Sequence, residues 1–402
     1  MLQTILLFII FSCCLFADSE VVYLTWQNDP SSTMTIHWLS KLDDENHSLE
    51  YSQSDGESKW LQKSACYKPL PENAPYNINT IELTALQPDT VYKFHILPSK
   101  EEHSFRTMPK TNDQSIRFVV GGDLFDKDQR AFETICKTVA KHSPRFVLLG
   151  GDLAYSVTAK RQHKEDFSRW YEFLRMWSTL LKDTQGAHIP LLPVIGNHEV
   201  KGYFHQTPKE APFFYALFAT PGPDGYKMIR FGSYLSVALL DSGHTHPVGG
   251  AQTEWLKSEL SKQIAITHRF ALYHVPAFPS VRSYRGAINT SIRNNWCPLF
   301  EKYGIHAAFE NHDHAFKRTH PLVHGDIDRF GVVYFGDGCW GTHPRIPKKA
   351  TRTGFLAVTK STRQFLQVDL TKTKRTYTAF DPNDVVVDTY IQEVDKPNPI
   401  DK

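Results

Sequence analysis

The sequence predicts an α/β protein of two domains, in which an all-β sandwich precedes a larger α/β domain. The chain has 402 residues, more than one domain usually contains. Residues 21–108 alternate between apolar and polar side chains in short runs, which is typical of half-buried strands. Beyond residue 115, nearly continuous apolar runs alternate with helical patterns, as in sheets that are covered on both faces.

The composition is that of an ordinary globular protein. Hydrophobic residues make up 41% of the chain, which is enough to build two cores. Lysine and arginine number 45 against 43 aspartates and glutamates, a net charge of +2. This balance gives no reason to expect nucleic acid or an anionic membrane as a partner. A charged substrate must therefore be bound by local groups.

The first 17 residues are predicted to be a signal peptide. They carry no charged side chain and contain an apolar run from Ile5 to Phe16, which is too short to span a bilayer. Lipid attachment at Cys13 is a less favoured alternative, because Phe11 is bulky. We expect the mature protein to be secreted or extracytoplasmic, in the periplasm, at the cell surface or in a lysosome-like compartment, without a membrane span.

Residues 18–110 are predicted to form the sandwich. The runs Thr33–Trp38 and Val91–Ile96 alternate as strands do, and clusters of Pro, Asn, Asp and Ser separate such runs. The segment Leu86–Tyr92 resembles the tyrosine corner of fibronectin type III domains, in which the tyrosine hydroxyl bonds to nearby backbone. We therefore expect a fibronectin III-like domain, with a linker at Pro109–Asp113.

In the α/β part, apolar strands repeatedly end in Gly, Asp, Asn or His. Strands are expected at 116–120, 145–149, 191–195, 270–273, 306–309 and 332–335, and helices at 129–141, 166–181 and 252–263. Such strand ends are where open α/β folds build their sites. They supply Asp123, Asp152, Asn197, His274, His312 and His314, with Tyr155 three residues after Asp152.

These side chains suggest a metal site. If a strand continued through His312 and His314, the two imidazoles would point to the same side, about 7 Å apart. On their own the two histidines are equally compatible with a polar turn. Carboxylate, amide and imidazole groups together, however, are ligands that iron, zinc and manganese sites use.

Five segments resemble the motifs of the calcineurin-like metallophosphoesterases, and within them the purple acid phosphatases. That pattern is GDxG, GDxxY, GNH followed by an acid, a histidine after a strand, and GHxH. The corresponding segments here are Gly122–Phe125, Gly151–Tyr155, Gly196–Glu199, Tyr273–Pro276 and Asn311–His314. The second and third match fully, whereas the first lacks its last glycine and the fifth its first. The resemblance covers almost the whole mature chain and implies a four-layer α/β/β/α catalytic domain over residues 114–390.

The resemblance also implies a binuclear metal centre, whose ligands would be Asp123, Tyr155 and His314 for one ion, Asn197, His274 and His312 for the other, and Asp152 as a bridge. Tyrosinate favours Fe(III) and would colour the protein purple, and the second ion would be Fe(II), Zn or Mn. The catalytic residue His198 would stabilise charge on the phosphate. Glu199 is expected to orient a neighbour or cap a turn, without a chemical role.

Several residues concern the substrate, and two positions among them depart from the family pattern. Many purple acid phosphatases have a further histidine about ten residues after the fourth motif, which is thought to protonate the leaving alcohol, but residues 275–285 contain none. Arg282 and Arg285 are candidates to clamp phosphate oxygens and Tyr284 to bind the ester oxygen, unless this loop is simply solvated. Asn311 stands where the family has glycine, so its side chain narrows access or adds a donor. His244 and His246 form another HxH pair, in a segment that we expect to be an exposed loop; a less favoured alternative is that the pair lines the site.

The expected function is a secreted, binuclear, metal-dependent acid phosphatase that hydrolyses phosphate monoesters of small molecules. A metal-bound hydroxide would attack phosphorus in line, with no covalent intermediate, and no G-x-S-x-G motif is present. One alternative is a phosphodiesterase of the same fold. Another is an inactive, metal-retaining binding protein whose sandwich holds a cell-surface or matrix partner, although such a protein would not need all seven ligands.

Overall fold

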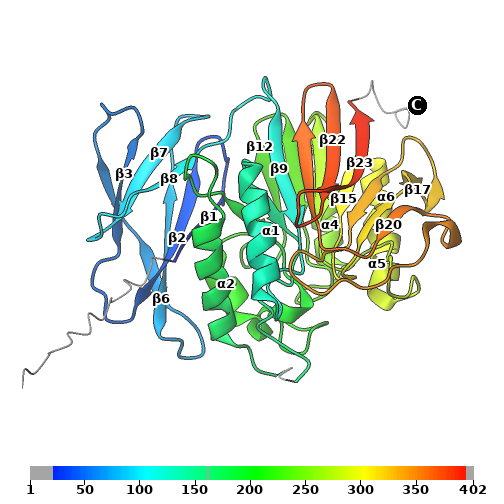
Figure 1. Ribbon diagram of the computed structural model, residues 1–402, viewed down its shortest axis with the longest axis horizontal. Helices are drawn as coiled ribbons and strands as arrows, with labels where there is room; N and C mark the ends of the chain where they lie inside the picture. Colours follow the sequence, from blue (N-terminus) through cyan, green and yellow to red (C-terminus); the bar gives the residue numbers. More distant parts are fainter. Residues whose placement is uncertain (1–20, 161–162, 395–402) are drawn as a thin grey trace, which may run out of the picture.

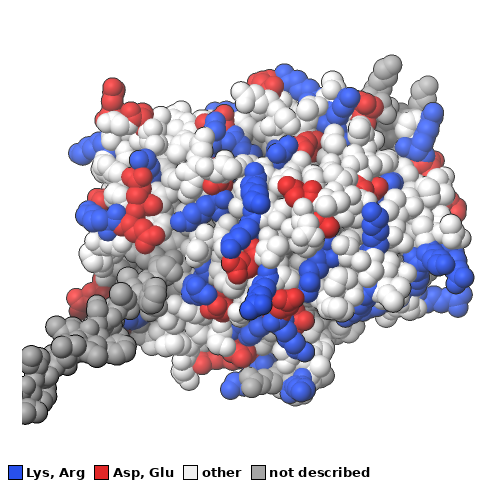
Figure 2. Space-filling view, in the orientation of Figure 1, with Lys and Arg blue, Asp and Glu red and all other residues white. Residues whose placement is uncertain are grey.

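The computed structural model describes residues 21–160 and 163–394 and shows a β-sandwich beside a larger α/β domain (Figure 1). The predicted signal peptide lies outside the described residues. Within them, no helix combines the length and the apolar character that crossing a membrane requires. Basic and acidic side chains are interspersed over the face shown in Figure 2.

The N-terminal domain is a sandwich of two four-stranded antiparallel sheets. In spatial order, the first sheet contains β1 (Val22–Thr25), β2 (Met34–Lys41), β6 (Tyr76–Leu83) and β5 (Cys66–Pro69). The second sheet contains β4 (Leu61–Ser64), β3 (Ser48–Gln53), β7 (Val91–Ile96) and β8 (His103–Arg106). Leu24 and Ile36 of the first sheet share one core with Phe94 and Phe105 of the second. The tyrosine-corner contact is also present, because the Tyr92 hydroxyl accepts a hydrogen bond from the Gln87 N–H at 2.8 Å.

Two mixed sheets form the centre of the α/β domain. The six-stranded sheet runs in the order β11 (Leu191–Pro193), β10 (Val147–Leu149), β9 (Ile116–Gly121), β21 (Phe365–Leu370), β22 (Lys374–Phe380) and β23 (Val386–Glu393). The seven-stranded sheet runs in the order β12 (Lys227–Phe231), β13 (Leu235–Leu239), β14 (His268–Leu272), β15 (Ala307–Phe309), β19 (Val333–Gly336), β16 (Phe316–Thr319) and β20 (Leu356–Lys360). β9, β10 and β11 are mutually parallel, as are β13, β14, β15 and β19.

The two sheets and the helices outside them form four layers. Successive side chains of a strand point to opposite faces, so each sheet contacts the other sheet on one face and helices on the other. Phe118 and Val120 of β9 share a core with Phe270 and Phe309 of the other sheet, whereas Val119 points to the opposite face. Helices α1 (Gln129–Lys141) and α2 (Phe167–Leu180) cover the outer face of the six-stranded sheet, and α4 (Ala251–Ser261), α5 (Ala287–Asn295) and α6 (Cys297–Lys302) cover that of the seven-stranded sheet. The predicted α/β/β/α arrangement is therefore confirmed.

Helix boundaries follow the capping signals in the sequence. The Asp128 carboxylate accepts the Ala131 N–H and begins α1, and the Asp166 carboxylate accepts the Ser168 N–H and begins α2. Both helices occupy the predicted ranges, and both start at the lower edge of the sheet in Figure 1, beside the loops that carry the predicted ligands.

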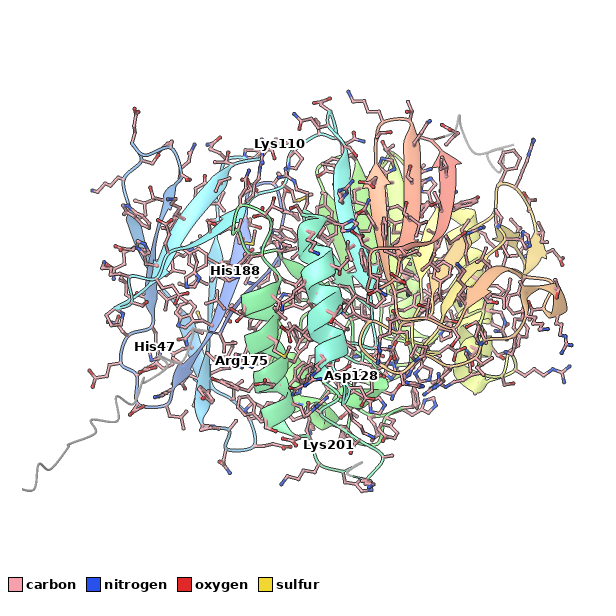
Figure 3. The ribbon with its side chains drawn as sticks, viewed as in Figure 1. His47, Lys110, Asp128, Arg175, His188 and Lys201 are labelled. Atoms are coloured by element: carbon pink, nitrogen blue, oxygen red, sulfur yellow. The ribbon has the colours of Figure 1, made fainter. Side chains whose placement is uncertain are left out.

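The sandwich and the α/β domain share a buried boundary. Tyr23 of β1 donates a hydrogen bond to the Leu217 carbonyl at 2.5 Å, and the Val22 N–H donates to Ser178 Oγ at 3.1 Å. His188, labelled in Figure 3, lies at the same boundary, with its Nε2 3.1 Å from Nδ1 of His103 in β8. Because side chains of both domains belong to common cores, the sandwich is a fixed support for the α/β domain.

Replacing Tyr92 by Phe should lower the free energy of unfolding by about 1 kcal/mol, because one hydrogen bond to the exposed Gln87 turn is lost while the ring stays packed. Chemical denaturation measures this change. The control is Tyr67→Phe, at a tyrosine that is 55% exposed on β5, which should leave the stability unchanged. Equal effects of the two substitutions would contradict a stabilising tyrosine corner.

Candidate metal centre

The seven predicted ligands come together in one buried cluster. They lie in loops at the carboxyl ends of β9, β10, β11, β14 and β15, so both sheets contribute to the cluster. None of the seven is more than 9% exposed. The cluster divides into two groups that share one carboxylate.

The first group contains Asp123, Tyr155 and His314. The Tyr155 hydroxyl lies 3.2 Å from Asp123 Oδ1 and 3.2 Å from His314 Nε2. His314 Nε2 lies 2.8 Å from the same Asp123 oxygen. The phenol, the carboxylate and the imidazole therefore converge on one point.

The second group contains His274, Asn197 and His312. His274 Nε2 lies 3.2 Å from Asn197 Oδ1 and 3.0 Å from His312 Nδ1. His274 Nδ1 donates to the Gly150 carbonyl at 2.8 Å, because a carbonyl only accepts. In the neutral ring, Nε2 then keeps a lone pair directed at the cluster.

Asp152 belongs to both groups. Ligand atoms of Asp152, His274 and His312 lie within 4.8 Å of one another, and so do those of Asp123, Asp152 and His314. His274 Nε2 is 3.3 Å from Asp152 Oδ2. This is the arrangement that two neighbouring cations bridged by one carboxylate would need.

The backbone of the cluster is unusual. Asp123, Asp152, Tyr155, His312 and His314 all have φ between 52° and 76°, the left-handed region that non-glycine residues rarely adopt. The idea that His312 and His314 face the same way because a strand continues through them is therefore wrong. β15 ends at Phe309, and left-handed turns direct both imidazoles inward.

Glu199 holds two ligand loops together. Its carboxylate accepts the N–H groups of Asp152 and Leu153 at 2.7 and 2.8 Å and that of Gly196 at 2.9 Å. A Cβ at Gly196 would lie 2.2 Å from the Asp152 nitrogen, so only glycine allows this approach. Glu199 thus orients its neighbours, as expected.

Asn311 fills space inside the protein. Its Nδ2 donates to the Tyr273 carbonyl at 3.0 Å, and the residue is 2% exposed. A Cβ at Gly150 would lie 1.8 Å from Nδ2 and one at Gly122 would lie 2.3 Å from Oδ1. The side chain therefore packs between the first two motifs and does not narrow access to the cluster.

The charged groups of the cluster shift one another's pKa. Burial alone would raise the pKa of Asp152, but the neighbouring imidazoles, His274 first, hold it well below its usual range. Burial would likewise lower the pKa of His274, but Asp152 and Asp123 raise it to about 9. Burial and these carboxylates raise the pKa of Tyr155 well above its usual value. Only a nearby cation would favour the phenolate, because positive charge stabilises it.

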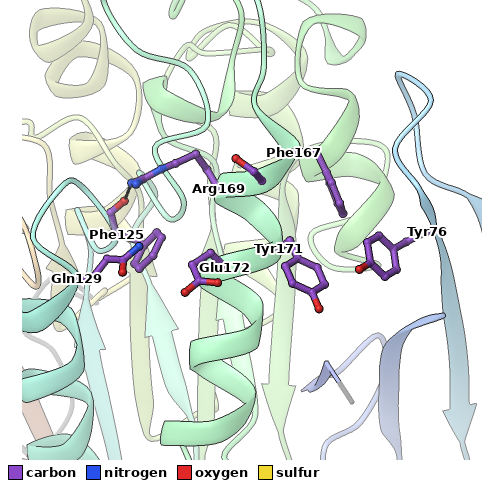
Figure 4. A pocket seen from close by; sticks show the side chains of 8 residues that line it. Tyr76, Phe125, Gln129, Phe167, Arg169, Tyr171 and Glu172 are labelled. Atoms are coloured by element: carbon purple, nitrogen blue, oxygen red, sulfur yellow. Dashed lines mark hydrogen bonds between the residues drawn. The ribbon is translucent and has the colours of Figure 1, made fainter. Parts of the chain in front are cut away.

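Arg169, which sequence reasoning missed, supports the first group from behind. Its guanidinium donates to the carbonyls of Phe125, Asp126 and Ala154, on the loops that carry Asp123 and Tyr155. The same side chain lies over the Phe125 ring and lines a cavity of about 480 Å³ at the sandwich boundary (Figure 4). In the sequence, Arg169 is one of several polar residues in a helix, so nothing indicated this role.

The proposed substrate residues have different positions. Arg282 lies at the edge of the cluster, where its guanidinium donates to the His312 carbonyl and to Asp313 Oδ1. Arg285 is exposed. Tyr284 is not brought to the cluster, because its ring packs against Phe355 and Arg293. Its hydroxyl instead lies 3.9 Å from the position a Cβ would have at Gly325, in the turn between β17 (Leu322–Val323) and β18 (Asp326–Ile327).

The expectation that His244 and His246 form an exposed loop is wrong for His244. His244 is fully buried, and its ring centroid lies 5.4 Å from that of His274. The Asp241 carboxylate accepts the N–H groups of His244 and His246, which folds the segment back into the protein. The contact between His244 and His274 joins distant parts of the chain and leaves no local signal in the sequence.

Comparison with known proteins agrees with this geometry. Residues 19–107 match the family described as purple acid phosphatase, N-terminal domain, and residues 116–316 match calcineurin-like phosphoesterase. Purple acid phosphatase 15 of Arabidopsis thaliana is 25% identical over 372 residues, which cover 81% of this chain and 67% of the relative. An uncharacterized protein of Mycobacterium tuberculosis (strain H37Rv) is 24% identical over 342 residues, 75% of this chain and 62% of the relative. The chain thus spans about two thirds of the length of these relatives or less.

Solved structures show the same fold. A purple acid phosphatase from yellow lupin seeds superimposes with a TM-score of 0.76 at 15% identity. The match covers 92% of this chain and 73% of the lupin chain. PhoD superimposes with a TM-score of 0.68 at 12% identity, and the match covers 94% of this chain and 92% of the PhoD chain. The phosphoesterase match alone takes in half of the chain, and the matching N-terminal domain precedes it. The chain therefore belongs to the purple acid phosphatase family of the calcineurin-like phosphoesterases, which are hydrolases.

Proposed function

We propose that this protein is a secreted acid phosphatase that hydrolyses phosphate monoesters at a binuclear metal centre. The observation that carries the proposal is the pair of ligand groups that share Asp152. We assign Asp123, Tyr155 and His314 to Fe(III), and Asn197, His274 and His312 to a divalent ion, Fe, Zn or Mn. A phenol oxygen in the first group and an amide with two imidazoles in the second fit these ions.

Two cations bound there would neutralise phosphate oxygens and lower the pKa of a water molecule. The protein groups do the remaining work. His198 Nδ1 donates to the Val157 carbonyl at 2.5 Å, which leaves Nε2 4.0 Å from Asp152 Oδ2. The His198 side chain is 23% exposed, unlike the buried ligands, so it can meet a phosphate oxygen directly. We assign it the charge-stabilising role, and Arg282, at the edge of the cluster, stays a candidate to bind the phosphate.

The domain limits belong to the same proposal: a signal peptide at 1–17, a fibronectin III-like domain at 18–110 and a catalytic domain at 114–390. The sandwich strands extend from Val22 to Arg106, and those of the α/β domain from Ile116 to Glu393, which supports these limits. Secretion rests on the leader sequence alone.

The metal-loaded protein should hydrolyse 4-nitrophenyl phosphate faster than bis(4-nitrophenyl) phosphate and absorb visible light. Rates for the two esters, together with metal content and the spectrum, test the proposal. A faster diester reaction would favour the phosphodiesterase, and a coloured protein that turns over neither ester would favour the binding protein.

Asp152→Asn should weaken binding of both metals by more than about 100-fold and abolish hydrolysis, because even partners of metal ligands cost 10–100-fold in affinity. Metal analysis after dialysis measures the loss. Asp126→Asn is the matched control, since Asp126 lies in an adjacent loop outside the ligand set and should keep two metals. Full metal content in Asp152→Asn would contradict the bridging role.

Arg169→Lys should reduce the affinity of the first ligand group, which contains Tyr155, for its metal ion by about 10-fold or more. The reason is that a lysine ammonium cannot reach all three carbonyls at once. The visible absorption should fade while the divalent ion stays bound. Arg175→Lys on the same helix is the control, because Arg175 pairs with Glu172, at 2.6 Å. Unchanged colour in Arg169→Lys would show that Arg169 does not support the first group.

A further inference from the structure

The loop between the GNH motif and the following helices forms an aromatic wall beside the cluster. Tyr203 meets the His198 ring edge to face, with ring centroids 5.5 Å apart. The next residue, Phe204, meets the His312 ring in the same way at 6.0 Å. Two consecutive aromatic side chains therefore cover two imidazoles that border the proposed metal site.

This wall is held in an unfavourable backbone conformation. Gly202, Tyr203 and His205 have φ of 85°, 70° and 58°. For a non-glycine residue the left-handed region is unfavourable, so surrounding contacts must fix this conformation. The loop's N–H groups at His205 and Gln206 donate to the carbonyls of Gly243 and His244, at 2.9 and 2.8 Å.

His244 completes this support. Its Nδ1 donates to the Tyr203 carbonyl at 3.2 Å, and its Nε2 lies 3.2 Å from Ser242 Oγ. Both ring nitrogens are thus engaged with the scaffold. The buried histidine fixes the position of Tyr203 and leaves the Tyr203 hydroxyl as the polar group of the wall.

The Tyr203 hydroxyl is buried but has no hydrogen-bond partner among the described residues. An unsatisfied buried polar group is destabilising, and a ligand that accepts its hydrogen bond removes this cost. Burial and the Asp152 carboxylate both raise the pKa of this tyrosine, so it remains a hydrogen-bond donor. The hydroxyl therefore belongs to a ring that contacts His198, and it lacks an acceptor among the described residues.

We propose that the Tyr203 hydroxyl donates a hydrogen bond to the leaving oxygen of the phosphate ester. This inference rests on the proposed phosphatase function. When the bond from phosphorus to the alkoxy oxygen breaks, its electron pair stays on that oxygen, where the hydrogen bond stabilises the charge, and water then supplies the proton. Tyr203 would thereby take over the task for which residues 275–285 supply no histidine.

The other candidates for this task are less suitable. The Tyr284 ring is held against Phe355, and its hydroxyl lies near Gly325. Arg282 is already bound to Asp313 and to the His312 carbonyl. Tyr203 is the better candidate, because its ring contacts His198 and its hydroxyl has no partner among the described residues.

The test compares two phosphate monoesters, because only a poor leaving group needs help. Tyr203→Phe removes the hydroxyl and keeps the ring on His198. We expect kcat/KM to fall by about 100-fold for glycerol phosphate, whose leaving alkoxide is strongly basic, and by less than about 3-fold for 4-nitrophenyl phosphate. Metal content should stay unchanged, and the control Tyr67→Phe, at an exposed tyrosine on β5 of the sandwich, should leave both rates unchanged.

Equal losses for the two esters would overturn the inference, because a misplaced wall would slow both reactions alike. Unchanged rates for both would overturn it as well. If the metal-loaded wild-type protein hydrolyses neither ester, the proposed function itself fails and the role of Tyr203 fails with it, so the two failures can be told apart.

Discussion

The candidate site depends on one buried carboxylate, that of Asp152. A carboxylate that is 1% exposed loses its hydration, and it remains ionised only where positive or hydrogen-bonding groups replace the water. Here His274 and His312 face one side of it, and the His198 N–H donates to Oδ1 at 2.8 Å. The same carboxylate belongs to both ligand groups, so its position sets the spacing of the whole cluster.

Holding five ligands in left-handed backbone conformations requires a rigid surrounding. The two sheets supply it through a common apolar core, and buried polar side chains then join the loops to one another. Glu199 connects the second and third motifs, Arg169 connects the first and second, and Asn311 packs against both Gly122 and Gly150. Asn311, which stands where the family pattern has glycine, thus supports the site from inside the protein.

The sandwich has a structural part in this arrangement. Tyr23 and Val22 of its first strand bond to the α/β domain, and Trp26 packs against Phe146 and Phe231. A boundary with shared cores does not permit free domain motion. The site is therefore presented by a single rigid body.

The sequence alone determined the order of the elements, because alternation, apolar runs and aspartate caps are local properties. It also indicated the seven ligand types at strand ends, since parallel strands bring their carboxyl ends to one edge. The tertiary structure decided how they face one another: left-handed turns, and not a continuing strand, aim His312 and His314 inward. Arg169 and His244 became visible only there, because their partners lie far away in the chain, and a contact between distant residues leaves no periodic trace in the sequence.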